Sequence, residues 1–253
     1  MTTSEHGNRR DLKFFISTPS PCGYLKDRDS ISLFADPKFP FTPAVYDLLI
    51  DHGFRRSADY VYRPHCPSCH LCVPVRVPVE EFKPSRSQKR VWKRNQDLRV
   101  TTHKLGLKQE HFDLYKKYQQ SRHSEGEMAR HDINRYFEFL DSEWSETLLM
   151  EIRDGNRLIG VAITDVVRRG LSAFYTFFDP EEEQRSLGTF AILWQIKFAK
   201  RLQLPWLYLG YWISETRKMN YKTRFLPLEL RIDDGWQRIT RDELIAMQTK
   251  TGA

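Results

Sequence analysis

Apolar and polar positions alternate in three stretches of the second half of the chain. Residues 147–153 and 157–167 are two of these, and they flank Asp154-Gly155-Asn156, a sequence that favours a tight β-hairpin turn. A second turn at Arg168-Arg169-Gly170 leads into residues 171–178, which alternate again. The pattern predicts three consecutive strands that form a meander.

The period then changes from two residues to about 3.6. Beginning near Ser186, apolar side chains recur at the spacing of one helix face, at Leu187, Phe190, Ala191, Trp194, Phe198 and Leu202. A strand of the buried type follows over residues 206–211. A strand meander followed by a helix and a strand is typical of an α+β domain.

Elements in the first half of the chain are shorter. Strands are predicted over residues 12–17, 60–63 and 73–79, and the prolines of the last run favour an edge strand or a bulged one. Between the first two strands, Thr42 and Pro43 begin a helix whose apolar face consists of Val45, Leu48 and Leu49.

Two more helices are predicted after Gly106, with apolar faces at Phe112, Tyr115, Lys116 and Gln119, and at Ile133, Tyr136, Phe137 and Leu140. No flexible linker interrupts the chain, so we expect its parts to pack together. We divide it near residue 105 into a smaller α+β N-terminal domain, a second domain and two tails: residues 11–105, residues 106–240, and residues 1–10 and 241–253.

Composition indicates the class of partner. The 253 residues carry a formal net charge of +7, and the pI near 9.2 points to a polyanion. Hydrophobic residues make up 40% of the chain, too many for a disordered protein. No apolar run approaches the roughly 18–20 residues of a membrane span, and residues 1–10 lack an apolar signal core. We expect a soluble, cytoplasmic protein that does not bind membranes.

The four cysteines form one candidate metal site. Cys66, Cys69 and Cys72 are separated by two residues each, so their thiolates can converge on one ion, and Cys22 is the only other thiol. Four thiolates suit either zinc or an iron–sulfur cluster. The alternative is a set of reduced thiols that hold no metal.

Residues 83–94 form a second candidate site because they carry six cations and no carboxylate. Such a stripe binds a phosphate backbone with release of counterions, and an indole beside it can stack on a base. The stretch therefore favours nucleic acid over an ordinary solvated surface. The candidate residues are Arg86, Lys89, Arg90, Trp92, Lys93 and Arg94.

Aromatic and cationic residues also mix over residues 210–225, after the last predicted core strand. Sheets of the α/β type place ligands at the carboxyl ends of strands, so this segment is either part of a ligand site or a surface helix with an aromatic packing face. The chain has no Walker loop, Rossmann glycine motif, His-Glu-x-x-His or Gly-x-Ser-x-Gly. Arg185-Ser186-Leu187-Gly188-Thr189-Phe190 is similar to the coenzyme A turn of GNAT acetyltransferases, but Phe190 replaces the small residue that such a turn needs.

Several motifs together resemble one family. They are Pro21-Cys22-Gly23-Tyr24, Tyr62-Arg63-Pro64-His65-Cys66, Val73-Pro74-Val75-Arg76-Val77, Ser85-Arg86-Ser87-Gln88, Tyr208-Leu209-Gly210-Tyr211 and Met219-Asn220-Tyr221-Lys222. Over roughly residues 12–240 the chain resembles the aminoacyl-tRNA–protein transferases of the N-degron pathway. The similarity is greatest to the bacterial aspartate/glutamate leucyltransferases, which are related to the arginyltransferases.

The resemblance implies a GNAT-like C-terminal domain, a mixed sheet with flanking helices, that takes aminoacyl-tRNA in place of acetyl-CoA. It also implies transfer of the aminoacyl group, leucine in preference to arginine, to proteins that begin with Asp or Glu. The product would carry a destabilising N-terminus that leads to degradation. The choice of leucine rests on the resemblance alone.

The missing nucleophile motifs are compatible with this reaction, because an aminoacyl ester is already activated. A free α-amino group has a pKa of about 7.7–8.0, so an appreciable fraction is neutral near pH 7.5. Positioning of the two substrates can supply on the order of 7–11 kcal/mol of the barrier. The transfer requires no cofactor.

Under this hypothesis the acceptor's acidic side chain needs a cation, preferably an arginine in bidentate geometry. The candidates are Arg76, Lys218, Lys222 and Arg224. Tyrosines can orient the amine, stabilise the oxyanion or simply pack, and the candidates are Tyr175, Tyr211 and Tyr221. Asp179 can accept the amine's proton or form a turn with Pro180. The cysteine group would shape the acceptor pocket or sense oxidation.

Two other functions remain open at this point. A GNAT acetyltransferase would bind acetyl-CoA, against which the bulk of Phe190 argues. A non-catalytic tRNA- or RNA-binding module would bind nucleic acid with a steep salt dependence and leave an Asp-initiated peptide unchanged.

Overall fold

The largest element of the computed structural model, which describes residues 11–216 and 218–250, is an eight-stranded mixed sheet. Neighbouring strands run antiparallel except for β11 and β12. The strand order is β14 (Gly235–Ile239), β13 (Leu228–Ile232), β7 (Val73–Pro78), β12 (Trp206–Trp212), β11 (Gly170–Phe178), β10 (Arg157–Val167), β9 (Glu146–Asp154) and β8 (Arg99–Lys104).

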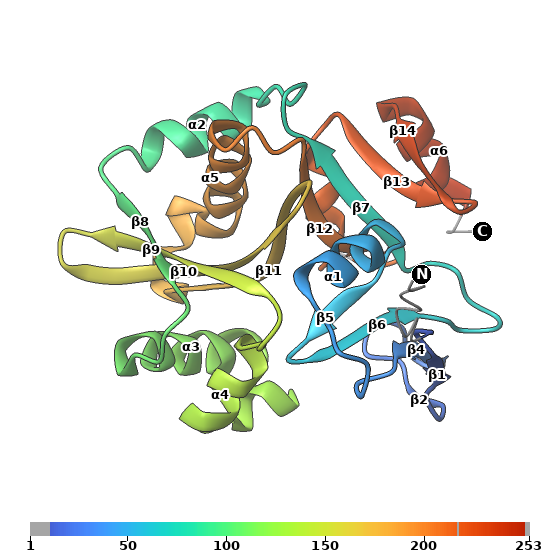
Figure 1. Cartoon of the computed structure of the whole chain (residues 1–253). Coiled ribbons are helices and arrows are strands. Elements are labelled where there is room, and N and C mark those ends of the chain that lie inside the picture. The colour runs from blue at the N-terminus through green and yellow to red at the C-terminus, as the bar shows by residue number, and fades with distance from the viewer. Residues whose placement is uncertain (1–10, 217, 251–253) are drawn as a thin grey trace, which may run out of the picture.

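Helices cover both faces of this sheet (Figure 1). On one face lie α5 (Leu187–Arg201) and α2 (Arg86–Arg94), and on the other lie α3 (Gln109–Arg122) and α4 (Ile133–Leu140). Short 3₁₀ turns complete the connections: η1 (Glu127–Arg130), η2 (Pro180–Arg185) and η3 (Asn220–Arg224). In the described part of the chain, no helix combines the length and the apolar character of a membrane span.

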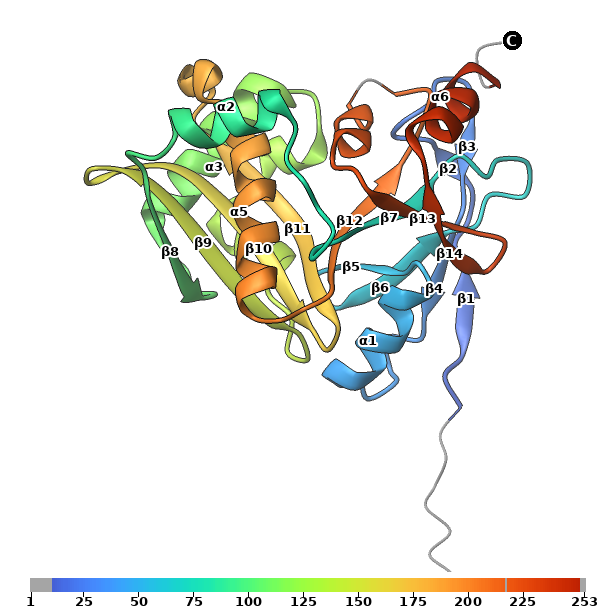
Figure 2. The same cartoon turned by 90° about the horizontal axis from the view of Figure 1, so that it is seen from above.

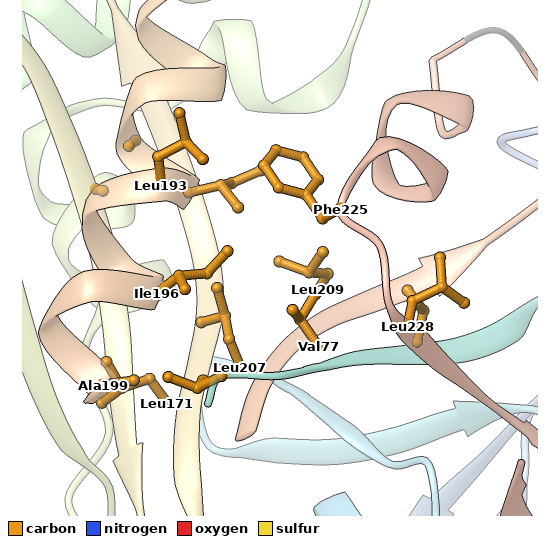
Figure 3. Packing of buried hydrophobic residues seen from close by; sticks show 14 of the residues in the cluster. Val77, Leu171, Leu193, Ile196, Ala199, Leu207, Leu209, Phe225 and Leu228 are labelled. Carbon is orange, nitrogen blue, oxygen red and sulfur yellow. The ribbon is translucent and has the colours of Figure 1, made fainter. Parts of the chain in front are cut away.

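Helix α5 is held by packing instead of capping. Ser186, which precedes it, has φ +52° and makes no side-chain cap bond, although such a bond is typically worth about 1 kcal/mol. Burial compensates, because a fully buried large apolar side chain contributes about 1.5–3 kcal/mol. Figure 3 shows Leu171 and Leu207, from the two parallel strands, close to Ile196 and Ala199 of α5.

A smaller four-stranded sheet lies on the side of β7 and β12 rather than that of β8 (Figure 1, Figure 2). Its order is β1 (Phe14–Ile16), β4 (Ser32–Ala35), β6 (Tyr60–Pro64) and β5 (Arg55–Ser57), and it packs with helix α1 (Pro43–Asp51). Strands β2 (Ser20–Pro21) and β3 (Asp29–Ser30) form a separate pair.

Thr42 caps α1 as predicted, but the buried face of this helix is shifted. Tyr46, Leu49 and Ile50 are buried, whereas Leu48 is 67% exposed and does not belong to the core. Both faces follow the i, i+3, i+4 spacing of a helix, but the buried one starts one residue later, so the helix is rotated by about 100° from the predicted orientation.

A buried ion pair joins the two sheets. Arg56 of β5 donates to both carboxylate oxygens of Asp165 on β10, at 2.9 and 2.6 Å, and neither side chain is exposed. The same guanidinium donates to the carbonyl of Leu140 and to Thr147 Oγ1. The smaller sheet is thereby fixed to β10, to the end of α4 and to β9.

The predicted α+β class, the meander of β9 to β11, the long helix and the strand after it are confirmed. Of the two alternatives predicted for β7, the edge strand is wrong, since β7 pairs with both β12 and β13, and the irregularity in its pairing with β12 is a register shift between Tyr208 and Gly210 of β12. Pro74 and Pro78 are tolerated because β13 pairs only with Val75 and Arg76.

Strands from both sides of residue 105 enter the large sheet, so the strand order does not mark a boundary there. The division of the chain into two domains stays a prediction. Residues 241–250, expected within a tail, form helix α6 (Arg241–Lys250). Thr240 and Glu243 exchange capping hydrogen bonds at its start, and Leu244 is buried in the main core. The expected tail at residues 1–10 and the last three residues lie outside the described chain.

Candidate functional site

The parallel strands β11 and β12 separate soon after they pair. Their register covers only Gly170, Leu171 and Ser172 against Trp206, Leu207 and Tyr208. Beyond it, β12 shifts register against β7 between Tyr208 and Gly210. Gly210 has φ +80°, a conformation that residues with a side chain rarely adopt. We call the gap that opens here the split between β11 and β12.

The side chain that enters the split is Arg55 of β5. Its Nη1 donates to Ser172 Oγ at 3.0 Å, and its Nη2 donates to the carbonyl of Ala173 at 2.9 Å. A Cβ added to Gly210 would lie 3.5 Å from Arg55 Cζ, so the guanidinium lies between the two strands. Sequence reasoning missed Arg55. The adjacent pair Arg55-Arg56 could have indicated it, because successive strand residues point to opposite faces of a sheet, so the two arginines reach different surroundings.

Lys222 of η3 lies near Arg55 and is turned inward, with 5% of its surface exposed. Its Nζ donates to the carbonyl of Tyr211 and contacts the sulfur of Met219 at 3.3 Å. Burial, and then the charge of Arg55, lower the pKa of Lys222 to about 7. A predicted substrate-binding lysine therefore lies at the split, with its ammonium directed at backbone.

The tyrosine predictions have different outcomes at the split. Tyr211 is buried, and its hydroxyl donates to the carbonyl of Gly53 at 2.8 Å, so this group is engaged in joining β12 to the turn after α1. Burial raises its pKa well above the usual value, and the cation of Arg55 opposes that effect. Tyr221 is 40% exposed and stays a candidate for contact with substrate.

Arg76 is not available to an acceptor carboxylate, which corrects the prediction. Its Nε donates to Glu229 at 2.8 Å, and its Nη1 donates to Asp51 at 2.7 Å. The guanidinium also stacks between the rings of Trp206 and Trp236, at 3.8 and 4.2 Å from their centres. Lys218 and Arg224 are exposed and stay candidates.

Tyr175 and Asp179 face α3 and do not join Tyr211 at the split. The Tyr175 hydroxyl accepts a hydrogen bond from Gln119 at 2.7 Å. Asp179 is 5% exposed, and its carboxylate lies 2.8 Å from Lys117 Nζ and 3.2 Å from an Arg157 nitrogen. Burial alone would raise the pKa of Asp179, but the bond from Lys117 and the nearby cations hold it below its usual value. These contacts favour the turn role of Asp179 over proton transfer.

The four cysteines are free thiols that gather beside the split. Burial, and then the charges of the other three, raise the pKa of Cys72 to about 12, and Cys72 in turn acts on Tyr211 and Lys222. Cys66 makes its hydrogen bonds with the backbone of Ile31.

Among residues 11–216 and 218–250, no three His, Cys, Asp or Glu side chains are arranged to hold a metal ion. The side-chain positions therefore do not form a coordination site, and a metal on Cys22, Cys66, Cys69 and Cys72 stays a prediction.

Helix α2 presents a cationic surface next to η3. Arg86, Lys89, Arg90, Lys93 and Arg94 are all exposed, and no carboxylate of the described chain forms an ion pair with them. Ser85 and Gln88 form a capping box at the start of the helix. Gln88 also donates to the carbonyl of Arg224 at 2.9 Å, which attaches α2 to η3.

Trp92 is half-buried, so its predicted stacking role stays a prediction. Its ring packs on Phe190 of α5 with 5.5 Å between centres, and Lys197 Nζ lies 4.9 Å from its centre. Phe190 itself is 3% exposed and packs in the main core beside α2. The expectation that its bulk disfavours a coenzyme A turn stays a prediction.

Comparison with known proteins agrees with this arrangement. Models of the arginine-tRNA-protein transferase N terminus and C terminus match residues 20–90 and 110–232. An aspartate/glutamate leucyltransferase of Hahella chejuensis is 46% identical over 229 residues, which are 90% of this chain and 98% of that protein. Enzymes of the same name from Pseudomonas fluorescens strain Pf0-1 and Nitrosococcus oceani are both 48% identical, over 89% of this chain and 96% and 95% of theirs.

A solved structure, the C-terminal domain of a putative lysylphosphatidylglycerol synthetase from Agrobacterium fabrum, has a TM-score of 0.47 and 11% identity, covering 83% of this chain and 70% of that one. The curated relatives match nearly half of all aligned residues across almost the full chain. The chain therefore belongs to the family of aspartate/glutamate leucyltransferases.

Proposed function

We propose that this protein transfers leucine from leucyl-tRNA to the N-terminal Asp or Glu of other proteins in the cytoplasm. The relatives that match along 90% of the chain carry that activity in their name. The supporting observation in the structure is the bond from Gln88 to Arg224. It fixes the cationic helix α2 against η3, so that a surface suited to tRNA phosphates leads to the split between β11 and β12.

In the proposed reaction the neutral α-amine of the acceptor attacks the carbonyl carbon of the leucyl ester. A C–N bond forms, the C–O bond to the terminal ribose breaks, and the ribose oxygen takes up a proton as the amine loses one. No side chain becomes acylated, and the step needs no metal. Lys218, Tyr221 and Arg224 are the exposed groups of η3 and its approach that can position the substrates.

The first experiment offers the purified protein leucyl-tRNA and peptides that begin with Asp, Glu or Ala. We expect the Asp and Glu peptides to gain the mass of one leucine residue and the Ala peptide to stay unchanged. Arginyl-tRNA and acetyl-CoA, offered separately, test the other donors. A peptide that gains no mass from leucyl-tRNA while the protein binds that tRNA would identify a binding module and refute the proposal.

The role of α2 is tested by the double substitution Lys89→Glu with Arg90→Glu. The matched control is Arg168→Glu with Arg169→Glu, an exposed adjacent pair at the other end of β11. We expect the first variant to bind tRNA more weakly and with a shallower salt dependence. Equal affinities of the two variants would remove α2 from the tRNA surface.

A further inference from the structure

We propose that Arg55 binds the side-chain carboxylate of the acceptor's N-terminal residue at the split between β11 and β12. This inference rests on the proposed function and adds the residue that selects the acceptor. Arg55 was not among the candidates from the sequence, and it takes the role predicted for Arg76.

Charge pairing distinguishes Arg55 from the other inward-facing arginines. Arg56, Arg76 and Arg153 each contact at least one carboxylate. Arg55 is half-buried, yet both of its contacts are to neutral oxygens, and no Asp or Glu of the described residues pairs with it. A cation withdrawn from water is costly unless an anion compensates it, so the site is suited to an anionic guest.

The neighbouring groups strengthen the positive character of the split. Lys222 is also buried, and its ammonium contacts a carbonyl oxygen and a thioether. It lies close enough to Arg55 for the two charges to act on each other. Tyr62 and Tyr211 are within the electrostatic reach of Arg55 and add no negative charge in their neutral state. Arg55 therefore lies beside an ionisable lysine, and the nearest buried carboxylate, Asp165 on β10, is already bound by Arg56.

The guanidinium is fixed in position and still has donors to spare. It carries five N–H groups, and the bonds to Ser172 and Ala173 use two of them. The remaining three can bind a carboxylate in bidentate geometry. Because two bonds to β11 already fix the group, little side-chain freedom is lost when an acceptor binds.

This site would discriminate between a carboxylate and its neutral amide. Asp and Asn have nearly the same shape, but only Asp neutralises Arg55. A site built around a buried polar group rejects an analogue that leaves the group unpaired. The wild-type enzyme should therefore prefer an Asp peptide to an otherwise identical Asn peptide.

The test measures transfer of leucine to Asp-initiated and Asn-initiated peptides by wild type, Arg55→Gln and the matched control Arg169→Gln, whose arginine is exposed at the turn before β11. We expect Arg55→Gln to lower kcat/KM for the Asp peptide by roughly 30-fold or more, which is the loss typical of a buried charge pair that loses one member. The ratio of kcat/KM for Asp over Asn should fall toward one, and the control should leave it unchanged. Thermal melting shows whether each variant is folded.

A milder variant covers the case in which Arg55→Gln does not fold. Ser172→Ala removes one of the two bonds that fix the guanidinium, and we expect it to raise KM for the Asp peptide more than it lowers kcat. An Asp-over-Asn ratio that stays at the wild-type value in every folded variant overturns the inference. The inference is also overturned if Arg55→Gln raises KM for leucyl-tRNA but leaves KM for the Asp peptide unchanged, since Arg55 would then bind the tRNA. Transfer of leucine to the Asp peptide by the wild type tests the proposed function, so its failure is distinguished from a failure of the role of Arg55.

Discussion

The buried pair of Arg56 and Asp165 gives the most direct test of how the two sheets are held together. Arg56→Met removes one partner and leaves a carboxylate with no exposed surface. The substitution also removes the donors to Leu140 and Thr147. Breaking a buried pair in this way typically costs about 3–5 kcal/mol, because the remaining charge has neither water nor a counter-ion.

Urea denaturation measures this cost. With a slope near 3 kcal/mol per molar urea, at the upper end for small proteins, the midpoint should fall by about 1–1.7 M. The control is Arg122→Met, which breaks an exposed pair with Glu183, and such a pair is worth at most about 1 kcal/mol. The double variant Arg56→Met with Asp165→Leu removes both charges of this pair and should be more stable than Arg56→Met alone.

A loss in free energy of unfolding for Arg56→Met that is no larger than the loss for Arg122→Met would contradict this role of the buried pair. A double variant that is less stable than Arg56→Met would contradict it as well, since the unpaired carboxylate of Asp165 would then not be the cause of the loss in stability.

Two further predictions concern groups that sequence reasoning either missed or assigned to chemistry. Burial alone would raise the pKa of Glu151, but hydrogen bonds lower it from 4.5 to about 2, and their donors are Lys108, Arg153 and His111. The carboxylate therefore contributes about 3 kcal/mol of stability above pH 5, which is lost as the pH falls toward 2. Glu151→Gln should be less stable than wild type at pH 7, and the difference in free energy of unfolding should shrink at pH 3; a constant difference would contradict the assignment. Tyr211→Phe removes the bond to Gly53 and should cost about 1 kcal/mol of stability while kcat is retained; a large loss of kcat in the folded variant would show that the hydroxyl has a chemical role.

Local elements were predictable because their signals lie in neighbouring residues. The hairpin at Asp154-Gly155-Asn156 and the cap at Thr42 depend on turn and helix geometry that a few residues determine. The capping box of α6 was readable in the same way from Thr240 and Glu243, although it was overlooked.

The availability of a charged side chain was not predictable, because its partners come from distant parts of the chain. Arg76 has ideal chemistry for a carboxylate, but Glu229, 153 residues further on, occupies it. Arg55 has no such partner in the described chain, and only the separation of β11 from β12 reveals where its guanidinium lies. The contact of Trp92 with Phe190 of α5 was likewise not readable, because the two residues are far apart in the sequence.

Strand β7 acts as a rigid spacer between two parts of the molecule that differ in chemistry. It begins at Val73, directly after Cys72, and the chain that leaves it at Pro78 leads to the cationic helix that starts at Arg86. It is hydrogen-bonded to β12 along one edge and to β13 along the other. A rearrangement of the thiol loop therefore cannot slide the strand lengthwise without breaking two ladders. Oxidation or ligation of the cysteines would act on the neighbouring Tyr211 and Lys222 rather than on the position of α2.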